Sequence, residues 1–536
     1  MKILLEHPPI AVYLKLHKVK NKEFIFFHKQ SASFKDVLKV NFIFVLMSSL
    51  KIFNTLSRKK EEFLALNPPF VGLYVCGPTV YDEVHLGNMR QFTSFDIVFR
   101  YLQFLGYKVR YVRNITDVGH LTDDGDLGED KIEKKARANK IEPMEIVQKY
   151  TNGFHHVSKL FNLIEPNIEP TATGHIVEQI EMVQRIIDNG YAYEVNGSVY
   201  FDVKKYMEKF DYGILSGRKV EEQLEQTRDN LEGGDEKRYF ADFGLWKAAS
   251  KDTIMKWSSP WGKGVPGWHL ECSVMSTKYL GQEFDIHGGG MDLKFPHHEC
   301  EIAQSVGADG KAPVRYWMHG NMLTVNGEKM SKSKGNSFLP LELISGEHPL
   351  LSKGFSPMVI RFFILQTHYS STLDFSNEAL EASEKGCNRL MNAYDLSSKL
   401  SPNTKDPSDG DKEIFIIAAR CKMEMDDDFN TPKTIASLFD LASITNKLKD
   451  GSIKVSAEGL ALLKITFKNY IEDVLGLQQE AKGNDAALLS AMSLILDMRM
   501  TARANKDWAT SDKIRDDLAA VGIIIKDDKD GATWSI

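Results

Sequence analysis

Gly-Leu-Tyr-Val-Cys-Gly-Pro, residues 72–78, is the stretch of sequence that decides the fold. Its first five residues form a short apolar run typical of a buried strand, and Gly77 and Pro78 end that strand. A helix is predicted from about Met89 to Leu105, where apolar residues recur at the spacing of a helix packed on one side. Residues 108–112 again have the pattern of a strand. Strand, crossover helix and strand form a βαβ unit and imply a parallel sheet.

A second unit of this kind follows much later in the chain, with a strand at 284–287, a helix beginning at His297 and a strand at 314–317. Residues 166–265 lie between the two halves of the predicted sheet, so they are expected to form an inserted module. Within that module, a helix is expected at 176–189 and a hairpin at 191–203.

The last third of the chain changes character after Ser376. Helical periodicity dominates to about Leu477, residues 478–484 have the composition of a linker, and a small terminal unit follows. That unit is expected to hold a helix at 507–520 and a β-like end at 523–536. The predicted fold class is therefore α/β: a Rossmann-type parallel-sheet domain with an inserted module, then an α-helical bundle and a small C-terminal unit.

Bulk composition sets limits on the function. The 536 residues exceed one core and suggest three or four domains. A net charge of -6 does not by itself indicate a nucleic-acid binder, although a local basic face on an acidic enzyme can still bind RNA. Five cysteines without disulfide-like spacing fit a reducing cytosol. We expect a cytoplasmic protein, since no apolar run reaches the roughly 18 residues needed to cross a membrane.

The first 46 residues stand apart from the rest, because they are rich in Lys and poor in acidic residues. Met47, Ser48 and Ser49 follow them like a second start. An upstream start codon or a loose tail is the favoured interpretation, and a functional extension is the alternative.

The loop at 78–88 suits a nucleotide. It lies between the first strand and its helix, at the carboxyl edge of the sheet where ligands bind. Gly87 would let a ligand approach the backbone, and the helix amino end favours phosphate. His85 can donate to a polyphosphate. The alternative is a plain turn capped by Asn88.

A second loop, residues 329–336, reads Lys-Met-Ser-Lys-Ser-Lys-Gly-Asn. Its lysines form a cationic patch that can stabilise charge developing on a leaving pyrophosphate, whereas the alternative is a solvated basic turn. The pairing of this loop, after the last strand, with the His85 loop, after the first, favours nucleotide chemistry.

Four further residues indicate zinc. Cys76 ends the first strand, Cys272 lies in the segment 266–273, and His297 and Glu301 stand four apart on one face of a predicted helix. Two thiolates, an imidazole and a carboxylate form a set that zinc accepts. For either cysteine alone, a small buried hydrophobe is the more ordinary interpretation.

Two neighbours complicate this set. Cys300 also faces the side of His297, and spacing alone does not choose between Cys300 and Glu301 as the fourth ligand. His298 is expected to point elsewhere on the helix and to be structural.

These motifs resemble the cysteinyl-tRNA synthetases, a family of class I aminoacyl-tRNA synthetases. The resemblance runs from about Leu50 to the C-terminus. The matching segments are 76–82, 85–88, 266–273, 287–290, 295–299, 329–333 and 506–509.

The resemblance implies roles for individual residues. The implied zinc ligands are Cys76, Cys272, His297 and Glu301, which selects Glu301 over Cys300. The implied cysteine pocket is Thr79, Trp268, His287 and Asp292. The implied ATP-binding residues are His85, Gly87, Asn88 and Lys332, and the implied catalytic residues are His85, Lys329 and Lys332. Asn88 departs from the family's HIGH motif, where a second His stands, and Asn cannot carry its charge.

The resemblance also implies the reaction. Cysteine and ATP, with Mg²⁺, would give cysteinyl-adenylate and pyrophosphate, and the cysteine would pass to the 3′ end of tRNA-Cys. One zinc per chain would select cysteine over serine, because thiolate binds zinc far better than an alcohol does. The insertion would then not be an editing domain. A monomer is expected. Candidate tRNA contacts are Arg499, Arg503, Lys506, Lys513 and Arg515, with Trp508 either stacking on a base or belonging to the core.

The expected domain boundaries follow from this pattern. They are 1–47 (extension, disordered or a start-site artefact), 48–165 (first catalytic half), 166–265 (connective module), 266–325 (second catalytic half), 326–375 (KMSKS loop and stem contact), 376–480 (anticodon-binding bundle) and 485–536 (C-terminal tRNA-binding unit). Two rivals are a ligase that joins cysteine to a small amine, whose family lacks the anticodon-binding end, and a catalytically dead RNA-binding paralogue.

Overall fold

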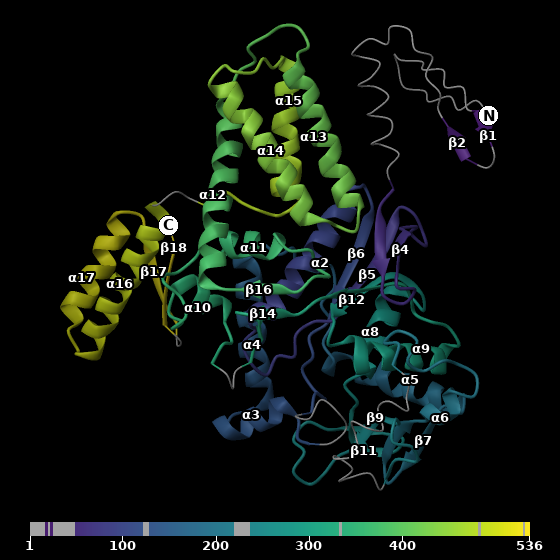
Figure 1. The fold of residues 1–536 in the computed structure, drawn as a ribbon. Helices are drawn as coiled ribbons and strands as arrows, with labels where there is room; N and C mark the ends of the chain where they lie inside the picture. The colour runs from purple at the N-terminus through teal and green to yellow at the C-terminus, as the bar shows by residue number, and fades with distance from the viewer. Residues whose placement is uncertain are drawn as a thin grey trace.

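The computed structural model describes residues 17–19, 22–24, 49–121, 128–218, 236–331, 335–480, 484–528 and 531–535 (Figure 1). Most of the extension predicted at 1–47 lies outside these residues. Its described part is a hairpin of β1 (His17–Val19) and β2 (Lys22–Phe24). A second hairpin, β3 (Lys51–Asn54) and β4 (Lys59–Glu62), precedes the main sheet.

The main sheet of the molecule has four parallel strands in the order β13-β12-β5-β6. Its strands are β5 (Phe70–Val75), β6 (Lys108–Arg113), β12 (Phe284–Gly290) and β13 (Val314–Gly320). The two βαβ units predicted from the sequence therefore join through β5 and β12, although these strands lie two hundred residues apart in the chain. All four carboxyl ends meet at one edge.

Helix α2 (Leu86–Phe104) makes the first crossover. The sequence predicted a helix packed on one side, but α2 is buried nearly all round, including Arg90, Asp96 and Arg100. The reason is tertiary: the sheet covers one side, and helices from the last third of the chain cover the other. The other helices of this half are α3 (Lys131–Asn139), α4 (Pro143–Leu160), α8 (Leu270–Leu280), which packs on β5 and β6, and α9 (Glu299–Asp309), with η3 (Lys294–His298) before α9.

The inserted module holds its own antiparallel sheet, β10-β11-β9-β8-β7, at the end of the molecule opposite the helical bundle (Figure 1). It begins with η1 (Thr173–His175) and α5 (Ile176–Asp188), which packs on α8 and α9. The predicted hairpin is β7 (Ala192–Val195) and β8 (Ser198–Phe201), followed by α6 (Val203–Tyr206). Three further strands, β9 (Phe243–Ala248), β10 (Trp257–Ser259) and β11 (Gly262–Pro266), were not predicted.

A small three-stranded sheet, β15-β14-β16, follows the last strand of the main sheet. It consists of β14 (Leu323–Val325), β15 (Glu328–Lys329) and β16 (Leu373–Phe375), with α10 (Pro340–Ser345) and α11 (Pro357–Leu365) between the last two in the chain. Parallel pairing of β14 with β16 fixes the start of the 329–336 loop against the domain that follows.

The last third is helical, as predicted. A bundle of α12 (Asn377–Lys399), α13 (Asp409–Asp426), α14 (Thr431–Lys449) and α15 (Ala457–Phe467), with η5 (Lys468–Val474), rises above the sheet (Figure 1). The terminal unit comprises α16 (Asn484–Ala504), α17 (Trp508–Ala520), β17 (Ile524–Asp528) and β18 (Gly531–Ser535), which confirms its predicted helix and β-like end.

One buried polar network joins the bundle to α2. The Arg361 guanidinium donates to Asp96 and also to the carbonyl oxygens of Leu475 (2.7 Å) and Phe161 (2.8 Å). Gly476 has φ +62, and an added Cβ there would lie 2.5 Å from the Arg361 Nη2 atom. Glycine is therefore required where the chain leaves the bundle and passes over the guanidinium.

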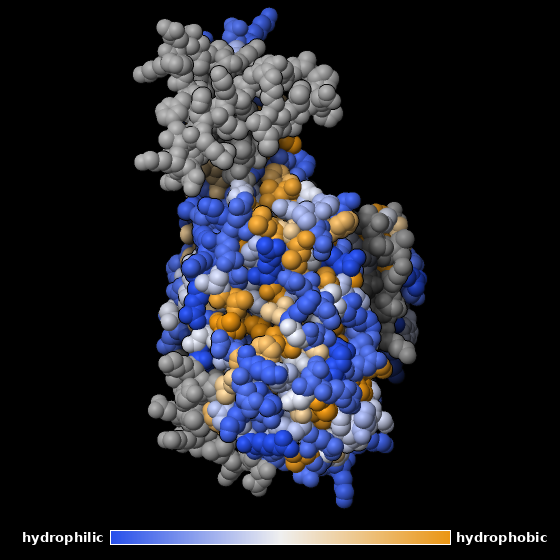
Figure 2. Space-filling model, turned by 90° about the vertical axis from the view of Figure 1, so that its right-hand side faces the viewer, coloured by the Kyte–Doolittle hydropathy of each residue, from blue (hydrophilic) through white to orange (hydrophobic). Residues whose placement is uncertain are grey.

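Among the described residues, no helix is both long enough and apolar enough to cross a membrane. Figure 2 shows one face of the molecule, on which apolar side chains gather in separate patches between hydrophilic ones.

Candidate active site and metal centre

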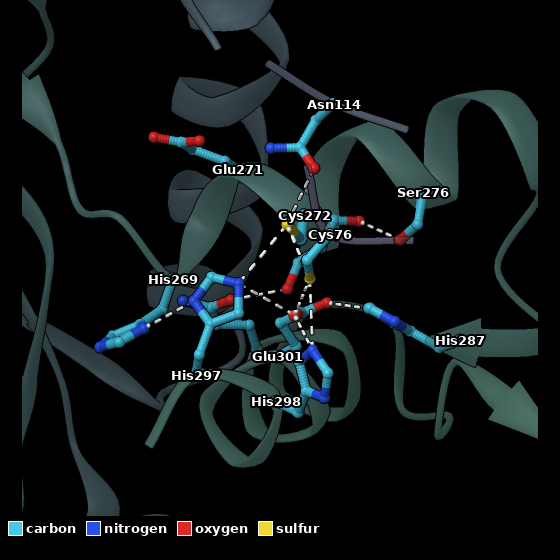
Figure 3. A network of polar contacts seen from close by, with 12 residues as sticks. Cys76, Asn114, His269, Glu271, Cys272, Ser276, His287, His297, His298 and Glu301 are labelled. Carbon is cyan, nitrogen blue, oxygen red and sulfur yellow. Dashed lines mark hydrogen bonds and ion pairs between the residues drawn. The ribbon is translucent and has the colours of Figure 1, made fainter. Parts of the chain in front are cut away.

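The carboxyl edge of the sheet gathers two cysteines, a histidine and a glutamate (Figure 3). Cys76 directly follows β5, and its N–H donates to the Gly288 carbonyl of β12 at 3.1 Å. Cys272 lies in the first turn of α8, and His297 and Glu301 flank the start of α9. All four side chains are buried, and one ligand atom from each lies within 4.8 Å of the others.

The distances within this cluster are those of side chains facing a common point. The Cys76 and Cys272 Sγ atoms are 3.6 Å apart, and His297 Nε2 lies 3.4 Å from Cys272 Sγ and 3.2 Å from Glu301 Oε1. Cys76 Sγ is 4.0 Å from Glu301 Oε1. Asn114, from the loop after β6, accepts from the Gly77 N–H at 2.9 Å and keeps Cys76 in place from above.

The electrostatics of the cluster fit a divalent cation. Burial raises the pKa of the Cys76 and Cys272 thiols and of the Glu301 carboxyl, and it lowers the pKa of His297. Without a cation, three ionised acidic groups would repel one another in a space closed to water. A divalent cation favours the ionised thiols and the neutral imidazole together, so the donor set suits zinc.

The prediction that His298 points away from the candidate metal ligands is wrong. Its Nε2 atom lies 3.2 Å from Cys76 Sγ, so it faces the cluster rather than pointing elsewhere. Its Nδ1 atom is 2.8 Å from His319 Nε2, and His319 Nδ1 is 2.8 Å from the Thr55 hydroxyl. A second possible metal group, of Cys76, His287, His298 and Glu301, results from this orientation.

Cys300, the alternative fourth ligand, lies in neither group. Its sulfur is 3.5 Å from the Tyr212 hydroxyl of the inserted module. The two groups of side chains that could hold a metal, among the described residues, both contain Glu301 instead.

The four residues of the implied cysteine pocket lie around the cluster. The Trp268 ring lies 4.5 Å from the His297 ring, with the two ring planes tilted by 31°. His287 Nε2 is 2.8 Å from Glu301 Oε2. Asp292 lies near the end of β12, beside Gly290, and its charge contributes to the raised pKa of the Cys76 thiol.

Thr79, the fourth pocket residue, contacts His120, a residue that the sequence analysis did not identify. Its hydroxyl oxygen is 2.7 Å from His120 Nδ1, and the His120 ring stacks on Trp268 at 4.2 Å and 7°. The available signal was position: His120 follows β6, so it belongs to another loop at the carboxyl edge of the sheet.

The His85 loop forms the amino end of α2. His85 is the N-cap, its Nδ1 atom accepting from the Asn88 N–H at 3.3 Å, and Asn88 Oδ1 accepts from the His85 N–H at 3.0 Å. This reciprocal capping gives Asn88 a structural reason to replace a histidine. Because Nδ1 accepts, the proton of a neutral His85 lies on Nε2, where it can be donated.

The described start of the 329–336 loop, at Met330, lies beside the His85 loop. Leu86 N–H donates to the Phe338 carbonyl at 2.9 Å, and an added Cβ at Gly87 would lie 3.4 Å from the Met330 Cε atom. Lys329 is exposed at the end of β15. Lys332 lies outside the described residues.

The terminal unit changes two expectations. Arg499, a candidate phosphate contact, is 3% exposed and donates to the Ser511 carbonyl, so it ties α16 to α17. Trp508 is 58% exposed, which excludes the core interpretation. Arg515 lies at the surface and pairs with Asp512 and Asp516.

Comparisons with known proteins agree with this architecture. A model of the class I (C) tRNA synthetase catalytic domain matches residues 62–385, and a DALR-domain model matches residues 420–479. A model of the cysteinyl-tRNA ligase anticodon-binding domain matches residues 487–534. The solved structure of Mycobacterium tuberculosis methionyl-tRNA synthetase with methionyl-adenylate aligns with a TM-score of 0.52 over 76% of this chain and 89% of its own, at 14% identity. That identity supports the fold alone.

The sheet, its edge site and these matches define a class I tRNA synthetase, which is a ligase. Cysteine–tRNA ligase of Porphyromonas gingivalis is 55% identical over 490 residues, 91% of this chain and 99% of the relative. That of Chlorobaculum tepidum is 50% identical over 503 residues, again 91% and 99%. The chain belongs to the cysteine–tRNA ligase family, so the predicted fold class and family are confirmed.

Proposed function

We propose that this chain performs both steps of cysteine–tRNA ligation at the carboxyl edge of the β13-β12-β5-β6 sheet. Cysteine attacks the α-phosphorus of ATP through its carboxylate, giving cysteinyl-adenylate and pyrophosphate. The terminal ribose hydroxyl of tRNA-Cys then attacks the acyl carbon and releases AMP. No protein nucleophile is required, so catalysis depends on positioning and on stabilising developing charge.

The buried cluster would hold one zinc ion through Cys76, Cys272, His297 and Glu301. Two thiolates suit zinc better than the second group, which has one. Bound there, zinc supplies an affinity for the substrate thiolate that the hydroxyl of serine does not match. His287 would orient Glu301, and His298 would orient Cys76, as groups behind metal ligands do.

The amino acid would bind against the aromatic wall that leads to this cluster. Trp268 packs on His297, so the indole and the metal ligands face a common space. Asp292 supplies a negative charge for the substrate ammonium group, and the Thr79 hydroxyl supplies a polar contact. Differential binding of thiol and alcohol at this point would make editing by the inserted module unnecessary.

The nucleotide would bind between the two adjacent loops. His85 Nε2–H would donate to the phosphates, and Gly87 would let them approach the amino end of α2. Asn88 would act through its cap on His85. Lys332 and Lys329 would stabilise charge on the leaving pyrophosphate together with Mg²⁺.

The tRNA would extend from this edge along the bundle to the terminal unit. Residues 326–375 would contact its stem, and residues 376–480 and 485–536 would bind its anticodon arm. Exposed Arg503, Lys506, Lys513 and Arg515 are the remaining candidate phosphate contacts, and exposed Trp508 can stack on an unpaired base. We further propose that the enzyme is a cytoplasmic monomer.

The single observation that carries the proposal is the convergence of two thiols, an imidazole and a carboxylate beside the His85 loop. The test is charging of purified tRNA-Cys by the purified protein, with cysteine and with serine. Cysteine-dependent charging with little serine transfer is expected. Cysteine-dependent ATP–pyrophosphate exchange without transfer to tRNA would favour the small-amine ligase, and no exchange would favour a dead paralogue.

A further inference from the structure

His120 contacts three residues that together fix its orientation. Its Nδ1 atom is 2.7 Å from the Thr79 hydroxyl oxygen, and its Nε2 atom is 2.8 Å from the Lys131 ammonium nitrogen. Its ring stacks on Trp268 at 4.2 Å and 7°. Trp268 in turn lies 4.5 Å from the His297 ring, so His120 stands one ring away from the cluster of candidate metal ligands.

The backbone holds this arrangement independently of the side chains. Lys131 is the first residue of α3, and its N–H donates to the His120 carbonyl at 3.0 Å. Gly119 has φ +83, and an added Cβ there would lie 2.8 Å from the Pro266 carbonyl oxygen. The loop that carries His120 therefore approaches the segment that carries Trp268 as closely as a glycine allows.

The contact with Lys131 determines which nitrogen of His120 carries the proton. An ammonium group has donors only, so Nε2 must accept, and the neutral ring then has its proton on Nδ1. The Thr79 oxygen, 2.7 Å from Nδ1, is in position to accept that proton. The Thr79 oxygen therefore accepts a hydrogen bond from His120. The hydrogen of the Thr79 hydroxyl can then be donated to a further acceptor.

Cysteine offers two anionic acceptors, a carboxylate and a thiolate, while its ammonium group only donates. The thiolate is already accounted for by the cluster of Cys76, Cys272, His297 and Glu301, none of which is Thr79. The carboxylate remains, and it is the group that must be held in line with the α-phosphorus for adenylate formation.

We propose that His120, oriented by Lys131, is a positioning residue of the cysteine pocket: it directs the Thr79 hydroxyl toward the carboxylate of the substrate and holds the Trp268 indole by stacking. This inference rests on the proposed function, because it takes Thr79 and Trp268 as pocket residues.

The first experiment separates the hydrogen bond from the stack. His120→Phe keeps a ring on Trp268 and removes both nitrogens. In cysteine-dependent ATP–pyrophosphate exchange, kcat/KM for cysteine should fall on the order of tenfold, since one charge-assisted hydrogen bond is misdirected. The KM for ATP and the zinc content should not change. Lys131→Met should have the same effect in weaker form, and Lys134→Met, on the same helix, should have none.

A double-mutant cycle tests the route through Thr79. In a Thr79→Val background no hydroxyl is left to direct, so His120→Phe should add almost nothing to the loss. Cysteamine, which lacks the carboxylate, should inhibit wild type and His120→Phe equally, whereas 2-aminobutyrate should inhibit the variant less.

Several outcomes would overturn the inference: independent, additive losses in the cycle, wild-type kinetics in both His120→Phe and Lys131→Met, or a rise in the KM for ATP equal to that for cysteine. Weaker cysteamine inhibition of the variant would also overturn it, by pointing to the thiolate. Failure of the proposed function is distinguishable, because the wild type itself would then show no cysteine-dependent exchange.

Discussion

Arg361 and Asp96 form a buried ion pair across 265 positions of the chain. Asp96 lies in the middle of α2, whose amino end is capped by His85, and Arg361 lies in α11 and also binds the Leu475 carbonyl. Arg100 donates to Asp96 from the next turn of α2, at 2.7 Å. The Asp96 carboxylate thus connects α2 to α11 and, through Arg361, to the end of the helical bundle.

Replacement of Arg361 by Met should lower the free energy of unfolding by about 3–5 kcal/mol, because it removes one partner of a buried charge. Lys399→Met is the control: its pair with Asp395 is exposed, and its loss should cost less than about 1 kcal/mol. Denaturant unfolding of both variants measures the difference. Equal small losses would show that the buried pair contributes no more than a surface pair.

The same pair should make stability depend on pH. Burial opposes ionisation of Asp96, but Arg361 and Arg100 outweigh it and hold its pKa below the usual value. A carboxyl with a lowered folded pKa stabilises the protein above its unfolded pKa of about 4, and this contribution is lost as the pH falls through the folded value. The stability gap between wild type and Arg361→Met should therefore narrow below about pH 4. A gap that stays constant from pH 7 to pH 3 would contradict this.

Metal analysis should find close to one zinc per chain. Glu301→Ala should lower that content, because it removes a donor common to both possible metal groups, whereas Cys300→Ser should leave it unchanged. Cys272→Ser distinguishes the two groups, since Cys272 belongs to the first alone. Full zinc content in Cys272→Ser would favour the group with His287 and His298. If the enzyme were active without bound metal, zinc could not be what selects cysteine over serine.

Lys332→Ala should slow adenylate formation far more than it weakens cysteine binding. A contact made mainly in the transition state lowers kcat and kcat/KM together, and one such donor is typically worth about 3 kcal/mol, roughly a hundredfold. Lys353→Ala, on the exposed surface, serves as the control. Pyrophosphate exchange near the wild-type rate would show that the 329–336 loop is a solvated turn.

Truncation after Glu480 should leave cysteine-dependent pyrophosphate exchange largely intact and sharply reduce transfer to tRNA. The cut spares the sheet, and it also spares the Glu480 carboxylate that accepts from the Met358 N–H at 3.1 Å. Transfer by the full chain should weaken as salt rises, because phosphate contacts release counterions. If the shortened chain charges tRNA as well as the full chain does, residues 485–536 do not bind tRNA.

Much of the fold was predictable because the relevant signals are local. The strands at 72–76 and 108–112 and the helix between them have clear periodicity, and all three exist. The burial of α2 on its second side was not predictable, because it depends on Arg361 and on the bundle. Strands β9 and β11 were missed because glycine, lysine and proline break their β pattern.

The site divides in the same way. The sequence spacing and the family resemblance together pointed to Cys76, Cys272, His297 and Glu301, and the structure brings them together. His298 was misplaced because the prediction compared it only with its neighbour His297. It stands three residues before Glu301, so on a regular helix it lies on the same side as that carboxylate, and its Nε2 atom is 3.9 Å from Glu301 Oε1. His120 was missed because its role depends on contacts with Trp268 and Lys131 that no spacing encodes.

The separation of Cys76 from Glu301 by 225 residues has a consequence for biosynthesis. At a translation rate of about 5–20 residues per second, the ribosome needs roughly 10–45 s to reach Glu301 after it has made Cys76. During that interval the nascent chain carries an unshielded thiol and an unfinished parallel sheet that awaits β12. Oxidants or competing soft metals should therefore harm this enzyme most while it is being made, and hardly at all once α9 has closed over the sulfur.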